Sequence, residues 1–131
     1  MLDSGIPVMA TMTFGSTPQG FYTLMGSSVK TAAAEMEKAG ANIVGSNCGD
    51  GMDNMVGIAR EFRKCARVPV AIQGNAGLPV ADGTDLVYPE TPEFYAGKAQ
   101  ELLTLGVQII GGCCGTRPEH IQAIRKVVDN R

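Results

Sequence analysis

The chain has 131 residues, of which 44% are hydrophobic and 18% charged, and these values are typical of one folded domain. Its net charge is −2 and the sequence holds no basic run, so neither a nucleic acid nor an anionic membrane is expected as a partner. No segment approaches the ~18 apolar residues of a membrane span. The segment 1–5 has neither the basic nor the apolar run of a signal peptide, and we therefore expect a cytoplasmic protein.

Short β-branched segments alternate with longer helical ones along the chain. In chain order the predicted elements are strand 6–12, helix 29–38, strand 41–46, helix 54–64, strand 68–73, helix 92–105, strand 107–110 and a last helix from about residue 116. The segments 14–27 and 74–90 are predicted as long loops rich in Gly and polar residues. The candidate capping residues are Asp50 and Asp53 for the second helix, Thr91 and Pro92 for the third, and Thr116 with Glu119 for the last.

Four strand–helix repeats in this order predict a parallel sheet with right-handed crossovers. A complete (βα)8 TIM barrel takes ~200–250 residues. We therefore assign the fold class α/β and expect residues 1–131 to form a parallel (βα)4 half of such a barrel, although a sheet of four parallel strands can also remain open. In either arrangement a ligand site lies at the carboxyl ends of the strands.

The most specific motif is Gly-Gly-Cys-Cys-Gly-Thr at 111–116, which follows a predicted strand and precedes a predicted helix. Adjacent cysteines rarely form a disulfide with each other because the peptide between them is strained. Both can reach one metal ion where flanking glycines let the backbone turn sharply. Cys48 follows the second strand in the same way, so Cys48, Cys113 and Cys114 are expected to meet where the strands end.

Three cysteine thiolates with an open fourth position are the ligand set of a catalytic zinc site. Thiolates select zinc over magnesium or calcium. Zinc lowers the pKa of a bound thiol, and three anionic ligands keep the bound sulfur rich in electrons. The pattern therefore favours alkylation of a substrate thiol, such as methyl transfer, over the activation of water.

Two other residues are expected to lie outside this chemistry. Cys65 ends the second predicted helix, away from the strand ends, and is expected to be structural. His120, the only histidine, falls in the first turn of the last helix and is expected to face solvent. Thiol redox chemistry between Cys113 and Cys114 is an alternative to metal binding, but it leaves Cys48 without a role.

Three motifs in order, Asn-Cys at 47–48, Gly-Asn-Ala-Gly-Leu-Pro at 74–79 and the cysteine motif at 111–116, resemble those of the zinc-dependent homocysteine S-methyltransferase family. The likeness is closest to the homocysteine-binding domain of the cobalamin-dependent methionine synthases. It extends over essentially the whole chain and matches the C-terminal half of the family's barrel, strands five to eight.

The resemblance implies zinc bound by Cys48, Cys113 and Cys114, homocysteine as the thiol substrate and methionine as the product. It also implies that Asn75 holds the fourth zinc position until the substrate sulfur displaces it, while its alternative role is that of a turn residue. Family members take the methyl group from methylcobalamin, betaine or S-methylmethionine. Methylcobalamin on a partner domain is therefore one donor that the resemblance implies.

The N-terminal half of the family's barrel has no counterpart in this sequence. A half barrel leaves two sheet edges and an apolar face to be covered. We expect them to be covered by the rest of a longer chain, by a separate N-terminal half or by a second copy in a homodimer. Two functions are therefore open: a methyltransferase once the barrel is completed, or a zinc-binding half barrel without activity of its own.

Overall fold

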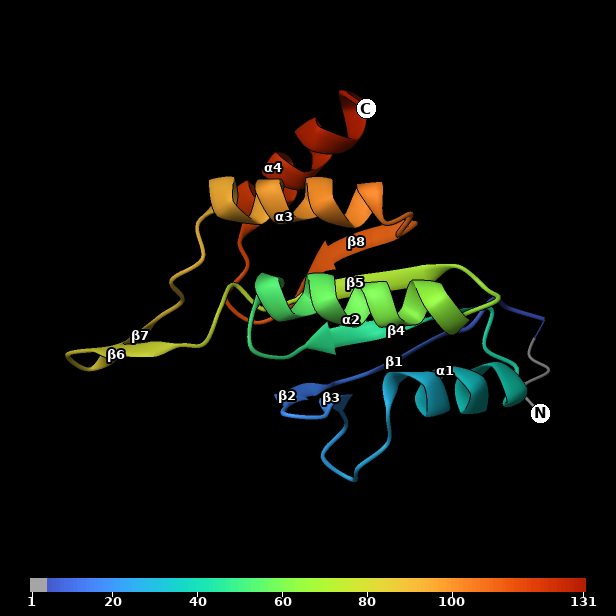
Figure 1. Cartoon of the computed structure of the whole chain (residues 1–131). Helices are drawn as coiled ribbons and strands as arrows, with labels where there is room; N and C mark the ends of the chain where they lie inside the picture. The colour runs from blue at the N-terminus through green and yellow to red at the C-terminus, as the bar shows by residue number, and fades with distance from the viewer. Residues whose placement is uncertain (1–4) are drawn as a thin grey trace.

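The computed structural model describes residues 5–131, and a parallel sheet of four strands lies at its centre (Figure 1). The strands lie in the order β1 (Met9–Met12), β4 (Ile43–Cys48), β5 (Val70–Gly74) and β8 (Ile109–Gly112). Each neighbouring pair is parallel. The predicted α/β class is confirmed, and β1 and β8 form the two edges of the sheet.

Each strand of the sheet begins two or three residues later than predicted. The reason is that pairing starts only where the backbone of one strand reaches its neighbour, and the preceding apolar residues lie before the first pairs of the ladder. Three of the strands also end later than predicted, at Cys48, Gly74 and Gly112. These later ends place Cys48 inside β4 and the first two glycines of the 111–116 motif inside β8.

Three helices connect the strands of the sheet, α1 (Val29–Lys38), α2 (Met52–Cys65) and α3 (Pro92–Thr104), and α4 (Pro118–Asp129) follows the last strand. Helix α2 covers β4 and β5, whereas α4 packs on α3 and β8 (Figure 1). Val44, Val70 and Ile72 of the sheet are 0% exposed, as is Phe62 of α2. Full burial of one such side chain contributes about 1.5–3 kcal/mol, so this layer anchors the strand ends that carry the cysteines.

Both segments that were predicted as long loops contain a short β-hairpin. The first consists of β2 (Gly15–Thr17) and β3 (Gly20–Tyr22), and the second of β6 (Val80–Asp82) and β7 (Asp85–Val87). Both hairpins extend from the side of the sheet where the strands end, and β6–β7 projects furthest (Figure 1). No helix within 5–131 has the length and apolar character needed to cross a membrane.

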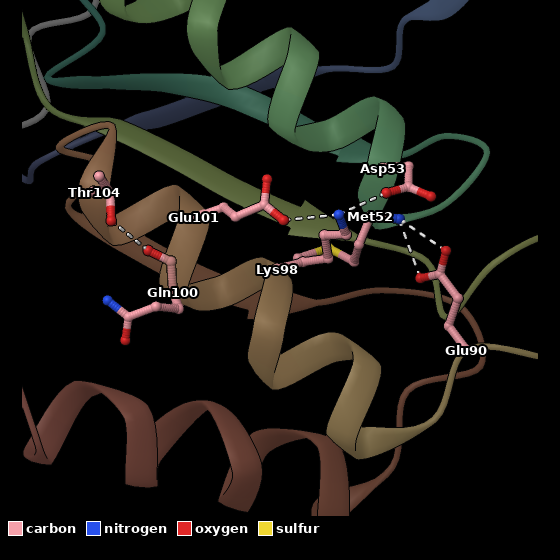
Figure 2. Close-up of polar contacts among 7 residues, drawn as sticks. All are labelled: Met52, Asp53, Glu90, Lys98, Gln100, Glu101 and Thr104. Atoms are coloured by element: carbon pink, nitrogen blue, oxygen red, sulfur yellow. Dashed lines mark hydrogen bonds and ion pairs between the residues drawn. The ribbon is translucent and has the colours of Figure 1, made fainter.

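The N-terminus of α2 is capped by a residue from a distant segment rather than by Asp50 or Asp53. Gly51 is the N-cap, with a φ of 121°. Both carboxylate oxygens of Glu90 lie 3.1 Å from the backbone nitrogen of Met52 and accept its N–H (Figure 2). The predicted caps were wrong because a left-handed Gly51 leaves no side chain at the cap position, and Glu90 supplies the acceptor across the fold.

Asp53 instead takes part in an ion pair between α2 and α3. Lys98 Nζ lies 2.8 Å from Asp53 Oδ1 and 2.8 Å from Glu101 Oε1 (Figure 2). The Asp53 side chain is 72% exposed, so the pair contributes at most about 1 kcal/mol. The pair links α2 to α3 at their surface.

The start of α4 also differs from the prediction. Thr91 and Pro92 open α3 as expected, with the Thr91 hydroxyl accepting the Phe94 N–H at 3.2 Å. In α4, however, Arg117 is the N-cap, and its N–H donates to His120 Nδ1 at 3.1 Å. The predicted capping box of Thr116 and Glu119 does not form, because Thr116 lies one residue too early and its hydroxyl donates to the Cys113 carbonyl.

Candidate metal centre

Three thiols meet at the carboxyl ends of β4 and β8. The Sγ atoms of Cys48, Cys113 and Cys114 all lie within 4.8 Å of one another. Cys48 Sγ and Cys113 Sγ are 2.9 Å apart although 65 residues separate them in the sequence. The structure thus brings together the three cysteines that were predicted to share one site.

The Cys48 end of the cluster is held by an unusual backbone conformation. Cys48 is the last residue of β4 and has a φ of 60°, the one positive φ found on a residue other than glycine within 5–131. This conformation costs an L-residue about 1–2 kcal/mol. Gly49 continues with a φ of 74°, so the chain turns sharply away from the strand and leaves the thiol at its end.

The loop that carries Cys113 and Cys114 is fixed from both sides. The Cys113 N–H donates to the Gly74 carbonyl of β5 at 2.8 Å, and the Thr116 hydroxyl donates to the Cys113 carbonyl at 2.7 Å. Gly115 has a φ of 78°, and a Cβ there would lie 2.1 Å from the Tyr88 ring. The glycine is therefore required both by its backbone conformation and by the close approach of Tyr88.

Asn75 links the two cysteine-bearing loops. Its Oδ1 accepts the Cys114 N–H at 2.9 Å, and its Nδ2 donates to the Gly49 carbonyl at 2.9 Å. The Cys114 carbonyl in turn accepts the Ala76 N–H at 2.9 Å. Asn75 is thus more than a local turn residue, while the role at a metal that the family resemblance implies for it stays a prediction.

Tyr95, which the sequence analysis did not single out, ties the ends of β5 and β8 together. This side chain of α3 is 0% exposed. Its hydroxyl lies 2.6 Å from the Gly74 carbonyl and 3.1 Å from the Gly111 carbonyl. The sequence offers only the spacing of Tyr95 with Ala99 and Leu102, which indicates a buried helix face but not a polar contact.

His120 packs behind Tyr95, and the prediction that it faces solvent was wrong. The residue is 5% exposed, and its ring lies edge-on to Tyr95 with centroids 5.4 Å apart. Because Nδ1 accepts the Arg117 N–H, the neutral ring carries its proton on Nε2, which lies 2.8 Å from the Glu90 carbonyl and donates to it. His120 therefore holds the segment whose Glu90 side chain caps α2.

The thiols of Cys48 and Cys113 influence each other's acidity. The hydrogen bond to Cys113 raises the pKa of Cys48 to about 11, and burial and the Cys113 charge act in the same direction. For Cys113 burial acts to raise the pKa, but hydrogen bonds from Cys48 and Cys114 outweigh it, and the pKa is lowered. The pair therefore favours a Cys113 thiolate with Cys48 as its hydrogen-bond donor.

Cys65 lies apart from this cluster, as predicted. It ends α2, and its thiol lies 3.3 Å from the Glu61 carbonyl and 3.6 Å from the Phe62 carbonyl of its own helix. Burial raises its pKa, with the charges of Glu37 and Glu61 adding to the effect. Cys65 is therefore a natural control for experiments on the other three cysteines.

The donor set and its spacing fit one zinc ion. Zinc–sulfur bonds of about 2.3 Å in a tetrahedral site place the sulfur atoms roughly 3.8 Å apart. The 4.8 Å limit on all three sulfur pairs and the 2.9 Å between Cys48 and Cys113 both lie within about 1 Å of that spacing. Cys114 is the exposed member, so the cluster remains open toward solvent on its side.

This chain combines a parallel sheet of alternating strands and helices with three thiols at the carboxyl ends of the strands. The sequence profile of the homocysteine S-methyltransferase family matches residues 1–128, and the chain belongs to this family. Among curated relatives, the methionine synthases of Mycobacterium leprae and Mycobacterium tuberculosis are each 36% identical to it, over 94% and 95% of this chain. The chain spans about 10% of the length of each of these relatives.

Solved structures support the fold. The homocysteine methyltransferase MmuM from Escherichia coli, in its oxidized form, superposes with a TM-score of 0.55 and 21% identity, covering 79% of this chain and 31% of that one. The dihydropteroate synthase of Yersinia pestis, in complex with a sulfonamide drug, gives a TM-score of 0.53 and 16% identity, covering 96% of this chain and 44% of that one. Both likenesses concern the fold alone, and in both the chain corresponds to less than half of the neighbour.

Proposed function

We propose that this chain is the zinc-binding half of a barrel that transfers a methyl group to the sulfur of homocysteine, giving methionine. The observation that carries the proposal is the cluster of Cys48, Cys113 and Cys114 at the carboxyl ends of the strands. Family membership and the two methionine synthase relatives support the same reaction. When bound, zinc would supply a substrate sulfur that is a thiolate at neutral pH and remains nucleophilic.

The residues of this chain would have distinct roles in that reaction. Cys48, Cys113 and Cys114 would hold the metal, and Asn75 would offer its amide oxygen at the fourth position until the substrate arrives. Asn75 already lies between the two cysteine loops, where its Oδ1 accepts the Cys114 N–H. Tyr95 would keep the ends of β5 and β8 at a fixed separation through its two carbonyl contacts.

Completion of the barrel is part of the proposal. Both edge strands, β1 and β8, are available for pairing, and the chain matches only 31% of the homocysteine methyltransferase structure. We propose that an N-terminal half or a second copy covers these edges and that the methyl donor, such as methylcobalamin, is brought by a partner domain. We also propose a cytoplasmic location, where thiols stay reduced. A half barrel that binds zinc without activity of its own is the alternative.

Zinc stoichiometry on the reduced chain tests the metal site first. The wild type and Cys65→Ser should each hold one zinc per chain, whereas Cys48→Ser and Cys113→Ser should lose it, because two thiolates with a hydroxyl bind zinc far more weakly. Retention of zinc in both cluster variants would contradict the site. Methionine formation by the zinc-loaded chain, alone and with an added N-terminal half barrel, would then separate an active enzyme from an inactive half.

A thiol redox pair is the second candidate, and one observation favours it. Cys48 Sγ and Cys113 Sγ lie 2.9 Å apart, and adjacent cysteines rarely form a disulfide with each other, so a redox pair would consist of Cys48 and Cys113 rather than of Cys113 and Cys114. Reversible loss of two titratable thiols in the wild type, but not in Cys48→Ala, would support this candidate. A chain that keeps both thiols under mild oxidant while it holds zinc would count against it.

A further inference from the structure

The side-chain amide of Asn47 lies against the sulfur of its neighbour in the chain. Asn47 Nδ2 is 3.4 Å from Cys48 Sγ. Consecutive residues of an extended strand point to opposite faces of the sheet, so such a contact is not expected within β4. The φ of 60° at Cys48 takes this residue out of the extended conformation, and the thiol is thereby free to face the Asn47 amide.

Thr11 determines which end of the amide faces the sulfur. The Thr11 hydroxyl in β1 donates to Asn47 Oδ1 of the neighbouring strand β4 at 2.9 Å. With the amide oxygen engaged by Thr11, the Nδ2 hydrogens are directed at Cys48. This orientation also suits a thiolate, which has no hydrogen of its own and can only accept.

The donor that the structure shows for the Cys48 sulfur is the Asn47 side chain, which itself depends on Thr11. The backbone N–H groups of Cys113 and Cys114 are engaged elsewhere, at the Gly74 carbonyl and at Asn75 Oδ1. A substitution of Asn47 or Thr11 can therefore remove the donor to Cys48 while these backbone bonds of the cysteine loop remain.

An N–H donor to a metal-bound thiolate withdraws electron density from the sulfur. In a site with three protein thiolates and one substrate thiolate, every sulfur competes for the same electrophile. We propose that Asn47, oriented by Thr11, is a positioning residue that donates a hydrogen bond to the Cys48 thiolate. This bond keeps Cys48 less nucleophilic than the substrate sulfur, so that the methyl group is not lost to the protein.

This inference rests on the proposed zinc site, and four variants test it. Asn47→Leu removes the donor, and Thr11→Val removes the hydroxyl that orients it. Thr11→Ser keeps that hydroxyl. Thr104→Val is the matched control, since the Thr104 hydroxyl donates to the Gln100 carbonyl on the exposed face of α3 (Figure 2). Thr104 is the last residue of α3, at the end of the helix that leads into the start of β8 rather than to its carboxyl end.

The first measurement uses Co²⁺ in place of zinc and records the sulfur-to-cobalt charge-transfer band. Loss of the N–H donor makes the sulfur easier to oxidise, so Asn47→Leu and Thr11→Val should shift the band to lower energy. Thr11→Ser and Thr104→Val should match the wild type. A merely structural role for Asn47 would change metal affinity or folding without this shift.

The second measurement is the alkylation of the zinc-loaded chain by iodoacetamide, followed by peptide mass mapping. Each event forms a carbon–sulfur bond as iodide leaves, and the rate at Cys48 is compared with the rate at Cys114. Asn47→Leu and Thr11→Val should raise the Cys48 rate about tenfold, the effect of one hydrogen bond to a charged sulfur. Thr11→Ser should leave the rate unchanged.

Different failures have different meanings. A wild type that binds neither Zn²⁺ nor Co²⁺ would overturn the proposed function and this inference together. A metal-loaded wild type whose band and Cys48 alkylation rate are unchanged in Asn47→Leu and Thr11→Val would overturn the inference alone. If Asn47→Leu does not fold, the pair Thr11→Val and Thr11→Ser decides, and identical behaviour of these two would also overturn it.

Discussion

Tyr95→Phe is the substitution that tests how the strand ends are held together. It keeps the ring, which is 0% exposed, and removes only the hydroxyl that lies 2.6 Å from the Gly74 carbonyl and 3.1 Å from the Gly111 carbonyl. Gly74 keeps a second partner, because its carbonyl also accepts the Cys113 N–H. The hydroxyl is the partner that the structure gives for the Gly111 carbonyl, so that group is left with the larger loss.

The expected cost is one hydrogen bond together with one poorly satisfied carbonyl, about 1–2 kcal/mol in the free energy of unfolding. For a domain of this length, that corresponds to a decrease in Tm of roughly 5 °C. Urea unfolding of the reduced, metal-free chain gives the free energy, and competition with a chelator gives the zinc affinity. The affinity should fall several-fold, because Gly74 directly precedes Asn75 and Gly111 is the first residue of the cysteine motif.

Tyr22→Phe in β3 is the matched control, since the Tyr22 hydroxyl makes no hydrogen bond with any residue in 5–131 that the structure describes. It should change the free energy of unfolding by less than about 0.5 kcal/mol. The reasoning is refuted if Tyr95→Phe is as stable as this control. Equal zinc affinity in Tyr95→Phe and the wild type would refute only the link between Tyr95 and the cysteine cluster.

Two further substitutions concern the segment that precedes α3. Burial raises the pKa of the Glu90 carboxyl above its ordinary value of 4.5. The folded chain therefore holds the carboxyl proton more tightly than the unfolded chain does. This contributes stability at low pH that is lost as the pH rises from 4.5 through the raised pKa. Glu90→Gln still offers an acceptor to the Met52 N–H but does not titrate. Between pH 4 and pH 7, urea unfolding should therefore show the wild type losing stability relative to Glu90→Gln. A difference in stability between the two proteins that is the same at both pH values would contradict this. Gly115→Ala combines a φ of 78° with a Cβ 2.1 Å from the Tyr88 ring and should cost about 2–3 kcal/mol, whereas Gly83→Ala, with a φ of 64° and open space, should cost only about 1 kcal/mol. Equal costs in thermal unfolding would show that the Tyr88 contact carries no energy.

The order of strands and helices and the meeting of three cysteines could be predicted from sequence, because both follow from local pattern and from parallel topology. Parallel strands place Cys48 and Cys113 at the same edge of the sheet, but β5 lies between β4 and β8, and the left-handed backbone at Cys48 is a local detail that the sequence did not predict. The β6–β7 hairpin was missed although a signal for it existed. Asp82 and Asp85 pair across a two-residue turn that begins with Gly83, a known hairpin pattern.

The contacts that were missed join residues far apart in the sequence. Glu90 caps α2 from 38 residues away, and His120 contacts the Glu90 carbonyl from 30 residues away. Neither contact can be recognised from the local sequence, because a glutamate in a loop and a histidine in the first turn of a helix are both ordinarily exposed to solvent. Asn47 and Thr11 are likewise 36 residues apart, and only the register of β1 beside β4 brings them into contact.

The distance of 65 residues between Cys48 and Cys113 has a consequence for the chain as a polymer. Any bridge between these two sulfurs closes a loop of that length in the unfolded chain, which lowers its entropy by the equivalent of about 4 kcal/mol at 25 °C. The closed loop contains α2, β5, the β6–β7 hairpin, α3 and β8, whereas β1 and α1 lie before it and α4 after it. A metal bound by both sulfurs would therefore close the middle of the chain into one loop and leave the segments before Cys48 and after Cys113 unrestrained.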